Sequence, residues 1–411
     1  MIEKHKKVTI VGIGTGNGTL TLEAINAIKD AEVLIGAQRM LDLAADVSME
    51  VQAGSKRVYP HYLAEEITKT IKAESSERFA VLVSGDVGFY SAAVGLAECL
   101  GEAGAELELI FVPGISIVNA FFAKLKLPWQ SAAFVSAHGR EADIVSYVRR
   151  NRLTFCLPGN NVGDIGTALT QTGLSHIKTY VGENLGTEPE RVYETLAEDL
   201  TNLDCPSLTV LLFENEAFDD RTLTGLPDNQ FSRLDGIPMT KSETRAIVMS
   251  KLKIRPSSIC WDIGAGTGSV TVEMALSAYF GHVYAVERRG GALPLIEKNC
   301  ESFHIGNVTV LHGEAPGTLE SLPAPDSVFI GGSGGEIANI IALVRDKNPR
   351  ARIVITSITP ETVSLASAAF KAAGEDIELT QINVARGKLV SGLHLMEAQN
   401  PVTIICAGGE L

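Results

Sequence analysis

The chain has 411 residues, of which 45% are hydrophobic and 20% charged, and its net charge is −14. This mixture is typical of a globular protein with two or three domains, and no apolar run is long enough to span a membrane. The negative charge argues against nucleic acid as a partner, although it leaves room for a local basic pocket that binds an acidic small molecule. The six scattered cysteines have no metal-binding spacing and no signal-peptide pattern is present, so we expect a cytoplasmic protein with free thiols and no metal site.

The first half of the chain alternates short apolar runs with helical spacers. Strands are predicted at residues 7–14, 33–36, 78–90, 107–116, 132–140, 152–161, 177–186 and 207–216. This alternation predicts an α/β fold with largely parallel strands. A break in the pattern near residues 124–130 predicts two lobes rather than one sheet.

The texture of the sequence changes between residues 217 and 235, which are polar, acidic and rich in turn residues. We expect this segment to link a first domain (1–216) to a second (236–411). In the second domain, strands and helices alternate at tight intervals from residue 240 onward, and two antiparallel-looking strands at 377–386 and 401–409 close the chain. This pattern predicts a doubly wound, Rossmann-like sheet with an antiparallel edge.

The sequence DIGAGTGS carries the strongest chemical signal. Asp262 ends a predicted strand, and Gly264, Gly266 and Gly268 follow it before a helix whose first N–H groups are unpaired. A dinucleotide fingerprint is spaced G-x-G-x-x-G, whereas this loop is spaced G-x-G-x-G with an acid directly before it. S-adenosylmethionine has a sulfonium, an amino group and a carboxylate but no phosphate, so the acid favours this cofactor.

Two further acids follow the next two predicted strands. Glu287 stands about twenty residues after the loop, where an acid binds a ribose diol. Glu314 and Ala315 stand where an acid commonly meets the adenine amino group in methyltransferases. Three acids at three successive strand ends favour S-adenosylmethionine, but Glu287 suits NAD as well, so an NAD-dependent oxidoreductase is the alternative.

Four motifs of the second half are more specific: GIPMTKSETRA, WDIGAGTGSVTVE, VFIGGSGGE and ARGKLVSGLHLMEAQNPV. From about residue 236 to the end, the chain resembles the decarboxylating precorrin methyltransferase domains of cobalamin synthesis. The resemblance implies a class I methyltransferase fold, S-adenosylmethionine and a corrin-precursor substrate. It also implies that Thr240 and the glycine turn, through Gly331 and Gly332, contact the cofactor.

The first half carries a second set of motifs: TIVGIGTGNGTLTLEAINAIKDAEVLIG, VLVSGDVGFYS, FVPGIS, VSAHGR and VGENLGTEPERV. Over about residues 7–214 they resemble the tetrapyrrole methylase superfamily, in which S-adenosylmethionine lies between two α/β lobes. The cofactor contacts that the resemblance implies are Gly85, Asp86, Val87, Pro113, Gly114, Ile115, Ser116, Ala137 and Pro206. Thr15 and Val87 replace prolines of the family, which predicts less rigid loops, and the first glycine-rich loop is expected to shape the substrate cleft.

A fusion of these two domains in this order resembles the bifunctional methyltransferases of cobalamin biosynthesis. The resemblance implies two S-adenosylmethionine sites per chain and a precorrin-6Y-type or cobalt-precorrin substrate. The first domain would methylate carbon 5, while the second would methylate carbon 15 and remove the carboxyl group of the ring C acetate. A non-catalytic corrinoid carrier is a further alternative, and we expect a homo-oligomer.

A substrate with many acetate and propionate arms requires local cations. The candidates are His138, Arg140, Lys241, Arg245, Arg386 and Lys388. Lys241 and Arg386 lie within the motifs, and His394 is a candidate proton carrier, so these three are the candidate catalytic residues. Nucleophilic triads and metal clusters are not apparent in the sequence, which fits a macrocycle that attacks the methyl group directly while the protein aligns the reactants.

Overall fold

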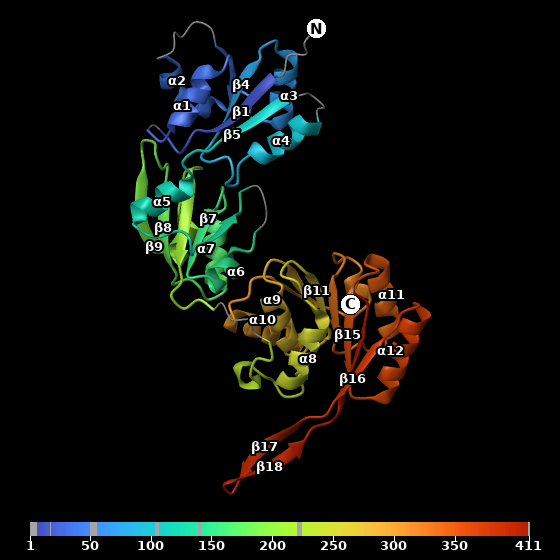
Figure 1. Cartoon of the computed structure of the whole chain (residues 1–411). Coiled ribbons are helices and arrows are strands. Elements are labelled where there is room, and N and C mark those ends of the chain that lie inside the picture. Colours follow the sequence, from blue (N-terminus) through green and yellow to red (C-terminus); the bar gives the residue numbers. More distant parts are fainter. Residues whose placement is uncertain are drawn as a thin grey trace.

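The structure, a computed structural model, describes residues 6–16, 18–49, 56–102, 107–138, 142–219 and 224–409. Figure 1 shows three successive α/β units, namely a first lobe in blue, a second lobe in green and a C-terminal unit in yellow to red. A search of the described helices finds none that could cross a membrane. The α/β fold class and the two lobes of the first half agree with the prediction.

The first lobe is a five-stranded parallel sheet in the order β3-β2-β4-β1-β5. Its elements are β1 (Lys6–Gly12), α1 (Leu22–Asp30), β2 (Val33–Gly36), α2 (Gln38–Met49), β3 (Arg57–Tyr59), α3 (Ala64–Ala73), β4 (Arg78–Val83), α4 (Ala93–Glu102) and β5 (Leu107–Val112). Burial in the central strands is continuous from Val8 to Gly12 in β1 and from Phe79 to Val83 in β4, because helices cover both faces of a parallel sheet. All parallel strands therefore end at one edge, where the loops after them meet.

The second lobe has the strand order β6-β7-β10-β8-β9. Its elements are α5 (Ile117–Leu125), β6 (Ala133–Ser136), α6 (Ile144–Arg150), β7 (Leu153–Leu157), α7 (Val162–Gln171), β8 (Lys178–Glu183), β9 (Arg191–Leu196), η1 (Ala197–Asn202) and β10 (Thr209–Glu214). Only β6 and β7 pair in parallel, whereas the expected pairing was largely parallel. The connection from β8 to β9 spans residues 184–190, which is too short for a parallel crossover and turns the chain back on itself.

The C-terminal unit is a seven-stranded sheet in the order β13-β12-β11-β14-β15-β19-β16. Its elements are η2 (Asp228–Gln230), α8 (Ser242–Leu252), β11 (Ile259–Ile263), α9 (Ser269–Ser277), β12 (His282–Glu287), η3 (Gly290–Ala292), α10 (Leu293–Ser302), β13 (Val308–His312), η4 (Gly317–Leu319), β14 (Ser327–Ile330), α11 (Ile337–Lys347), β15 (Arg352–Ser357), α12 (Pro360–Ala372), β16 (Glu378–Ile382), β17 (Ala385–Val390), β18 (Leu393–Ala398) and β19 (Val402–Ala407). Strands β11 to β15 are parallel, while β19 and β16 form the predicted antiparallel edge.

A two-stranded hairpin, β17–β18, interrupts this edge and projects away from the sheet (Figure 1). The sequence pattern had merged the start of the hairpin with the preceding strand. All six residues of β18 are exposed, so its apolar side chains face no core among the described residues.

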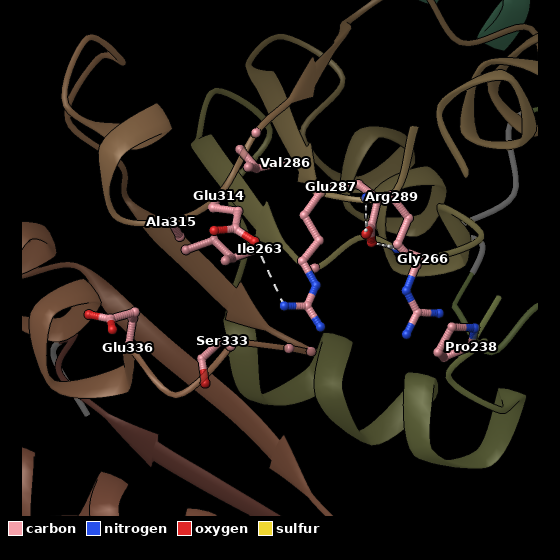
Figure 2. A pocket seen from close by; sticks show the side chains of 16 residues that line it. Pro238, Ile263, Gly266, Val286, Glu287, Arg289, Glu314, Ala315, Ser333 and Glu336 are labelled. Carbon is pink, nitrogen blue, oxygen red and sulfur yellow. Dashed lines mark hydrogen bonds and ion pairs between the residues drawn. The ribbon is translucent and has the colours of Figure 1, made fainter. Parts of the chain in front are cut away.

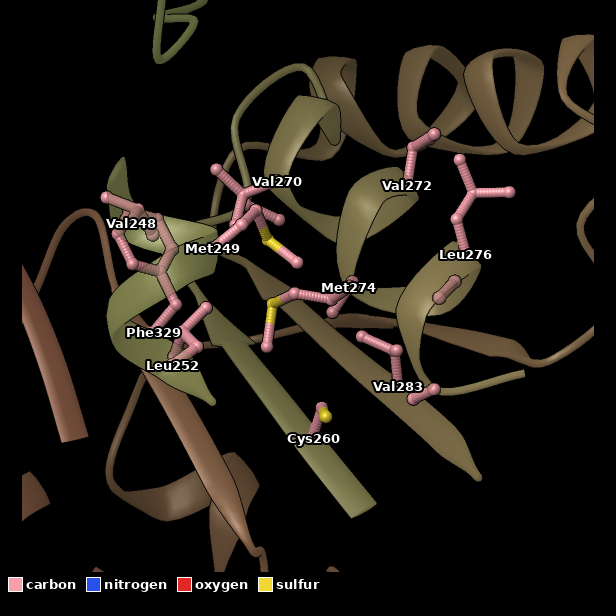
Figure 3. Close-up of a cluster of buried hydrophobic side chains, with 14 of the residues drawn as sticks. Val248, Met249, Leu252, Cys260, Val270, Val272, Met274, Leu276, Val283 and Phe329 are labelled. Atoms are coloured by element: carbon pink, nitrogen blue, oxygen red, sulfur yellow. The ribbon is translucent and has the colours of Figure 1, made fainter. Parts of the chain in front are cut away.

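The core of the C-terminal unit fixes the glycine loop that precedes α9. Eight of the nine residues of α9 are buried, because α8, α10 and the sheet surround the helix. Figure 3 shows α9 side chains such as Val270 and Met274 packed among residues of α8 and of the strands. The loop therefore ends on a rigid element.

Residues 224–235, within the expected linker, pack on this same core. Leu226 and Phe231 are buried in it, and the Glu273 carboxylate accepts hydrogen bonds from the backbone N–H groups of Gly225 and Leu226 at 2.8 and 2.9 Å. Arg245, considered above as a candidate cation, is fully buried and paired with Glu273 at 2.5 Å. Breaking such a buried pair costs about 3–5 kcal/mol, so Arg245 stabilises the fold instead of facing a substrate.

Candidate active sites

The first candidate site lies where the strand order of the C-terminal unit reverses, between β11 and β14. Both strands end at a glycine turn, and a Cβ placed on Gly264 would lie 2.8 Å from the backbone nitrogen of Gly332. A side chain would therefore block this close approach. Gly264 also has a φ of +75°, a backbone conformation that favours glycine. Ligands of doubly wound sheets bind outside the strand ends at this point.

A cavity of about 280 Å³ opens at these strand ends, and we call it the C-terminal pocket (Figure 2). Its walls come from the turns after β11, β12, β13 and β14 and from the segment before α8. Seven of the predicted cofactor residues line it: Gly264, Gly266, Glu287, Glu314, Ala315, Gly331 and Gly332.

Glu287 is the most firmly held acid of the C-terminal pocket. Its Oε2 accepts a hydrogen bond from the Gly266 N–H and its Oε1 accepts one from the Arg289 N–H, both at 2.9 Å. These bonds fix the carboxylate and tie β12 to the glycine loop. A carboxylate accepts about four hydrogen bonds, so both oxygens keep capacity for hydroxyl groups in the pocket.

The second candidate site lies between the two lobes of the first half. A cavity of about 300 Å³, which we call the N-terminal cleft, is lined by Thr15, Arg39, Ser84, Gly85, Asp86, Phe89, Tyr90, Ser116, Ile117, Ser136, His138, Leu157, Gly159, Leu185, Ser207, Leu208, Thr209 and Val210. These residues follow or end strands of both sheets. The predicted Gly85, Asp86 and Ser116 are among them.

Three loops of the first lobe pack tightly to form one wall of the N-terminal cleft. Gly85 and Gly14 exchange backbone hydrogen bonds of 2.9 and 3.1 Å, and a Cβ on Gly114 would lie 2.1 Å from the Gly85 oxygen. The Asp86 carboxylate accepts hydrogen bonds from the N–H groups of Gly88 at 2.8 Å and Gly114 at 3.3 Å. Asp86 thus organises the loops, while a Cβ on Gly85 would meet open space.

Comparison with known proteins identifies both halves. The tetrapyrrole (corrin/porphyrin) methylase model matches residues 7–201, and the precorrin methyltransferase domain model matches residues 230–407. A probable cobalt-precorrin-6B C(15)-methyltransferase (decarboxylating) from Pyrobaculum calidifontis is 42% identical over 44% of this chain and 95% of its own length. The chain belongs to the precorrin methyltransferase family.

Two further relatives bear on this precorrin methyltransferase. A precorrin-6Y C(5,15)-methyltransferase [decarboxylating] from a Sinorhizobium species is 29% identical over 96% of this chain and 95% of its own length. The crystal structure of a precorrin-6Y C5,15-methyltransferase from Geobacter metallireducens is 36% identical, covers 46% of this chain and 97% of its own, and gives a TM-score of 0.43.

Two of the predicted glycine-loop residues of the precorrin methyltransferase lie behind the C-terminal pocket. Asp262 is fully buried, accepts a 2.5 Å hydrogen bond from Thr271 Oγ1 through Oδ2, and leaves Oδ1 without a partner among the described residues. Burial raises the pKa of Asp262 to about 7. Gly268 starts α9 with a φ of +76°, and a Cβ there would lie 2.9 Å from Ile296. Both positions shape the loop from beneath.

Thr240 and the three candidate catalytic residues also lie outside the walls of the C-terminal pocket. Thr240 accepts a hydrogen bond from Arg245 through its carbonyl oxygen, and Lys241 is the N-cap residue of α8. Arg386 donates to Glu243 Oε1 at 3.0 Å and to Asp228 Oδ2 at 2.9 Å, and these bonds raise its pKa, so carboxylates of the protein already occupy its guanidinium. His394 lies exposed on β18.

Several predicted positions of the N-terminal cleft flank it without lining it. Val87, Pro113, Gly114 and Ile115 belong to the loops just described, and Pro206 precedes the lining residue Ser207. Ala137 lies between two lining residues, but it faces a groove next to the C-terminal unit. Arg140, a candidate cation, falls outside the described residues.

Sequence reasoning missed several cations and turn residues in both sites. Arg288 and Arg289 line the C-terminal pocket directly after Glu287, and Arg289 donates to the Gly236 oxygen at 2.7 Å. Arg39 lines the N-terminal cleft from the first turn of α2 and donates to Ser84 Oγ at 3.2 Å, while burial lowers its pKa. The position of Arg288 and Arg289 next to the predicted Glu287 could have identified them from the sequence, whereas Arg39 lies in no motif that would have done so.

The C-terminal pocket fits S-adenosylmethionine. Glu287 has free acceptor capacity for a ribose diol, and a Cβ on Gly332 would meet nothing within 4 Å, so that the turn leaves room for a ligand. The N–H groups of Gly331 and Gly332 point to the Ile263 oxygen. Those of Ser333 and Gly334, which line the pocket, have no partner among the described residues and are available to an anion.

Proposed function

We propose that this chain is a bifunctional S-adenosylmethionine-dependent methyltransferase of cobalamin biosynthesis. It methylates carbons 5 and 15 of a precorrin-6Y-type or cobalt-precorrin macrocycle and decarboxylates the ring C acetate. The observation that carries the proposal is the presence of two separate pockets at strand ends, one in each half of the chain that a family model matches. The Sinorhizobium relative, whose name gives both methylations and the decarboxylation, aligns with almost the whole chain.

In the C-terminal pocket the chain binds and orients both reactants. S-adenosylmethionine, when bound, supplies an electrophilic methyl group. Glu287 would hold its ribose, and Arg288 and Arg289 would hold carboxylate arms of the macrocycle. The N–H groups of Ser333 and Gly334 would face the acetate that is lost. On decarboxylation the bond to the carboxyl carbon breaks, carbon dioxide leaves, the conjugated ring takes up the electron pair, and the exocyclic carbon then gains a proton from solvent and becomes a methyl group.

In the N-terminal cleft the corresponding work falls to other residues. Arg39 and His138 lie on the walls of the cleft, and both would hold carboxylate arms. Asp86 keeps the surrounding loops in place through its two backbone hydrogen bonds. Carbon 5 of the macrocycle would act as the nucleophile, so the site needs alignment more than a strong base.

The proposal includes two cofactor sites per chain, a homo-oligomer and a cytoplasmic location. The hairpin supports assembly, since it exposes Leu389, Val390, Leu393, Leu395 and Met396. Exposed apolar clusters of this kind are typical of protein–protein contacts. The six free cysteines support a reducing compartment.

Product analysis tests the activity. The full chain, supplied with precorrin-6Y-type substrate and S-adenosylmethionine, should yield a product that has gained two methyl groups and lost one carbon dioxide by mass spectrometry. Binding of the macrocycle without turnover would instead favour the carrier, and NADH binding would favour the oxidoreductase. Calorimetric titration with S-adenosylhomocysteine should approach two per chain, and a value of one for folded chain would contradict the two sites.

A further inference from the structure

The two halves of the chain meet at one end of the C-terminal sheet. Arg150 of α6 donates to the Leu276 oxygen at 3.3 Å and stacks over the Tyr279 ring at 4.2 Å, while Tyr147 packs on Phe280 with ring centroids 4.9 Å apart. These C-terminal residues end α9 or lie in the loop before β12. The contact therefore lies at the amino end of the parallel strands.

A second set of contacts extends the interface along the same end. His304, in the loop between α10 and β13, forms a 2.6 Å hydrogen bond with the Thr172 oxygen at the end of α7. A Cβ on Gly306 in that loop would lie 3.2 Å from Val145. The groove beside these contacts is lined on the C-terminal side by Ser257, Ile259, Phe280, Gly281, His282, Gly306 and Asn307, which precede or begin β11, β12 and β13.

The C-terminal pocket lies at the opposite end of those same strands. Gly264, Glu287 and Gly313 line the pocket directly after or at the ends of β11, β12 and β13. A strand rises about 3.3 Å per residue, so the five residues of β11 separate the two ends by about 17 Å of packed sheet. The buried core on both faces of this sheet closes the direct path.

We infer that the intermediate leaves one site of a chain and enters the other from solvent, so that the two reactions are distributive. The inference rests on the proposed function, since it needs two reactions on one macrocycle. The C-terminal pocket opens at the carboxyl ends of the strands, whereas the half that contains the N-terminal cleft packs at their amino ends. The proposed macrocycle carries ionised arms, so it would stay soluble during transfer. Fusion of the halves thus produces the two active sites in equal numbers, but it does not connect them.

Complementation between two full-length variants tests this inference. Gly332→Leu fills the C-terminal pocket, and Ser207→Trp fills the N-terminal cleft from an exposed lining position. Each variant is first assayed alone, and Gly332→Leu should keep only the carbon-5 methylation and Ser207→Trp only the carbon-15 reaction. A variant that loses the other reaction overturns the proposed assignment, not the inference.

The two variants are then mixed at the wild-type concentration of each active site. Distributive transfer predicts doubly methylated product at the wild-type rate and with the same lag. A direct path between the two sites of one chain would raise the effective concentration of the intermediate at the second site, and the mixture of variants would lack this path. A mixture that forms product about tenfold or more slowly than wild type would therefore overturn the inference.

A second measurement needs no substitution. Unlabelled, singly methylated intermediate is added in excess while the wild-type chain converts labelled substrate. Distributive transfer predicts that the label in the final product falls in proportion to the dilution. Label that reaches the final product undiluted would overturn the inference.

Discussion

Gly266 and Gly332 both line the C-terminal pocket, but a side chain would meet different surroundings at the two positions. A Cβ on Gly266 would lie 2.5 Å from the Pro238 oxygen, at a φ of +57°, whereas a Cβ on Gly332 would meet open space. Both glycines were predicted from their sequence motifs to contact the cofactor. Only Gly332 leaves room that belongs to a ligand.

We therefore expect Gly332→Leu to weaken S-adenosylhomocysteine binding at one of two sites while leaving the unfolding temperature unchanged. Gly266→Val should lower both the affinity for S-adenosylhomocysteine and the unfolding temperature, because overpacking against the backbone costs about 1–3 kcal/mol or more. Calorimetric and thermal titrations measure these effects. Gly291→Leu is the matched control, since a Cβ there also meets open space but Gly291 does not line the pocket. Unchanged stoichiometry in Gly332→Leu would contradict the site.

Arg39 should determine how tightly the N-terminal cleft holds its macrocycle. A charged hydrogen bond to a carboxylate contributes about 1.5–3 kcal/mol, so Arg39→Met should raise the KM of the carbon-5 methylation about tenfold or more. Arg39→Lys keeps the charge without the planar guanidinium, so its KM should lie between those of wild type and Arg39→Met. The carbon-15 reaction of the same chain is the internal control. Equal KM values in all three proteins would exclude the contact.

Asp262 should make the stability of the C-terminal unit depend on pH. Its pKa is raised by burial from the ordinary 3.8 to about 7, so the folded chain retains a proton that the unfolded chain releases. The contribution of Asp262 to the free energy of unfolding is therefore highest below pH 4 and is lost as pH rises toward 7. Urea unfolding of wild type and Asp262→Asn should show the variant gaining relative stability between pH 5 and pH 7. A constant difference across this range would contradict the shift.

At the scale of elements, the β17–β18 hairpin is the part of the fold with the least support from its own chain. Alternation places Val390, Leu393 and Leu395 on one face and Leu389 and Met396 on the other. Leu393 is 76% exposed. Ion pairs from Arg386 to α8 and η2 anchor the base of the hairpin.

We expect the double substitution Leu393→Lys and Leu395→Lys to dissociate the proposed homo-oligomer. Burying two leucines contributes about 3 kcal/mol or more to association, so the dissociation constant should rise at least about 100-fold. Light scattering at micromolar concentration measures the mass. Leu365→Lys on α12, also an exposed leucine, is the control that should leave the mass unchanged. A monomeric wild-type chain would contradict the role of the hairpin.

The elements and strand ends were predictable from the sequence, but the direction of individual side chains was not. Glu287 and Gly264 were both predicted to contact the cofactor from the ends of successive strands, and both line the C-terminal pocket. Asp262 occupies a strand end too, yet its side chain points to Thr271 of α9, because successive residues of a strand face opposite sides. Spacing along the chain does not decide which side a helix covers. Arg386 illustrates the same limit, since its carboxylate partners come from distant segments.

At the scale of the whole molecule, the contact between the halves had no sequence signal. Tyr147 and Arg150 belong to the short helix α6, and Phe280 and His304 lie in loops, all places where aromatic and charged residues are also common on free surfaces. A hydrophobic pattern reveals which face of an element is buried but not what buries it. The families of the two halves, in contrast, were predictable, because each sequence motif lies within one half and each family model matches one half.

The placement of that contact at the amino end of the C-terminal sheet has a consequence for how such a gene can change. Neither the C-terminal pocket nor the glycine turns that build it contribute to the contact between the halves. Substitutions in the C-terminal pocket therefore leave the residues of this contact unchanged, so the second half can be joined to a partner domain without rebuilding that pocket. The Pyrobaculum relative aligns over 95% of its own length with only 44% of this chain, so it corresponds to one part of this chain.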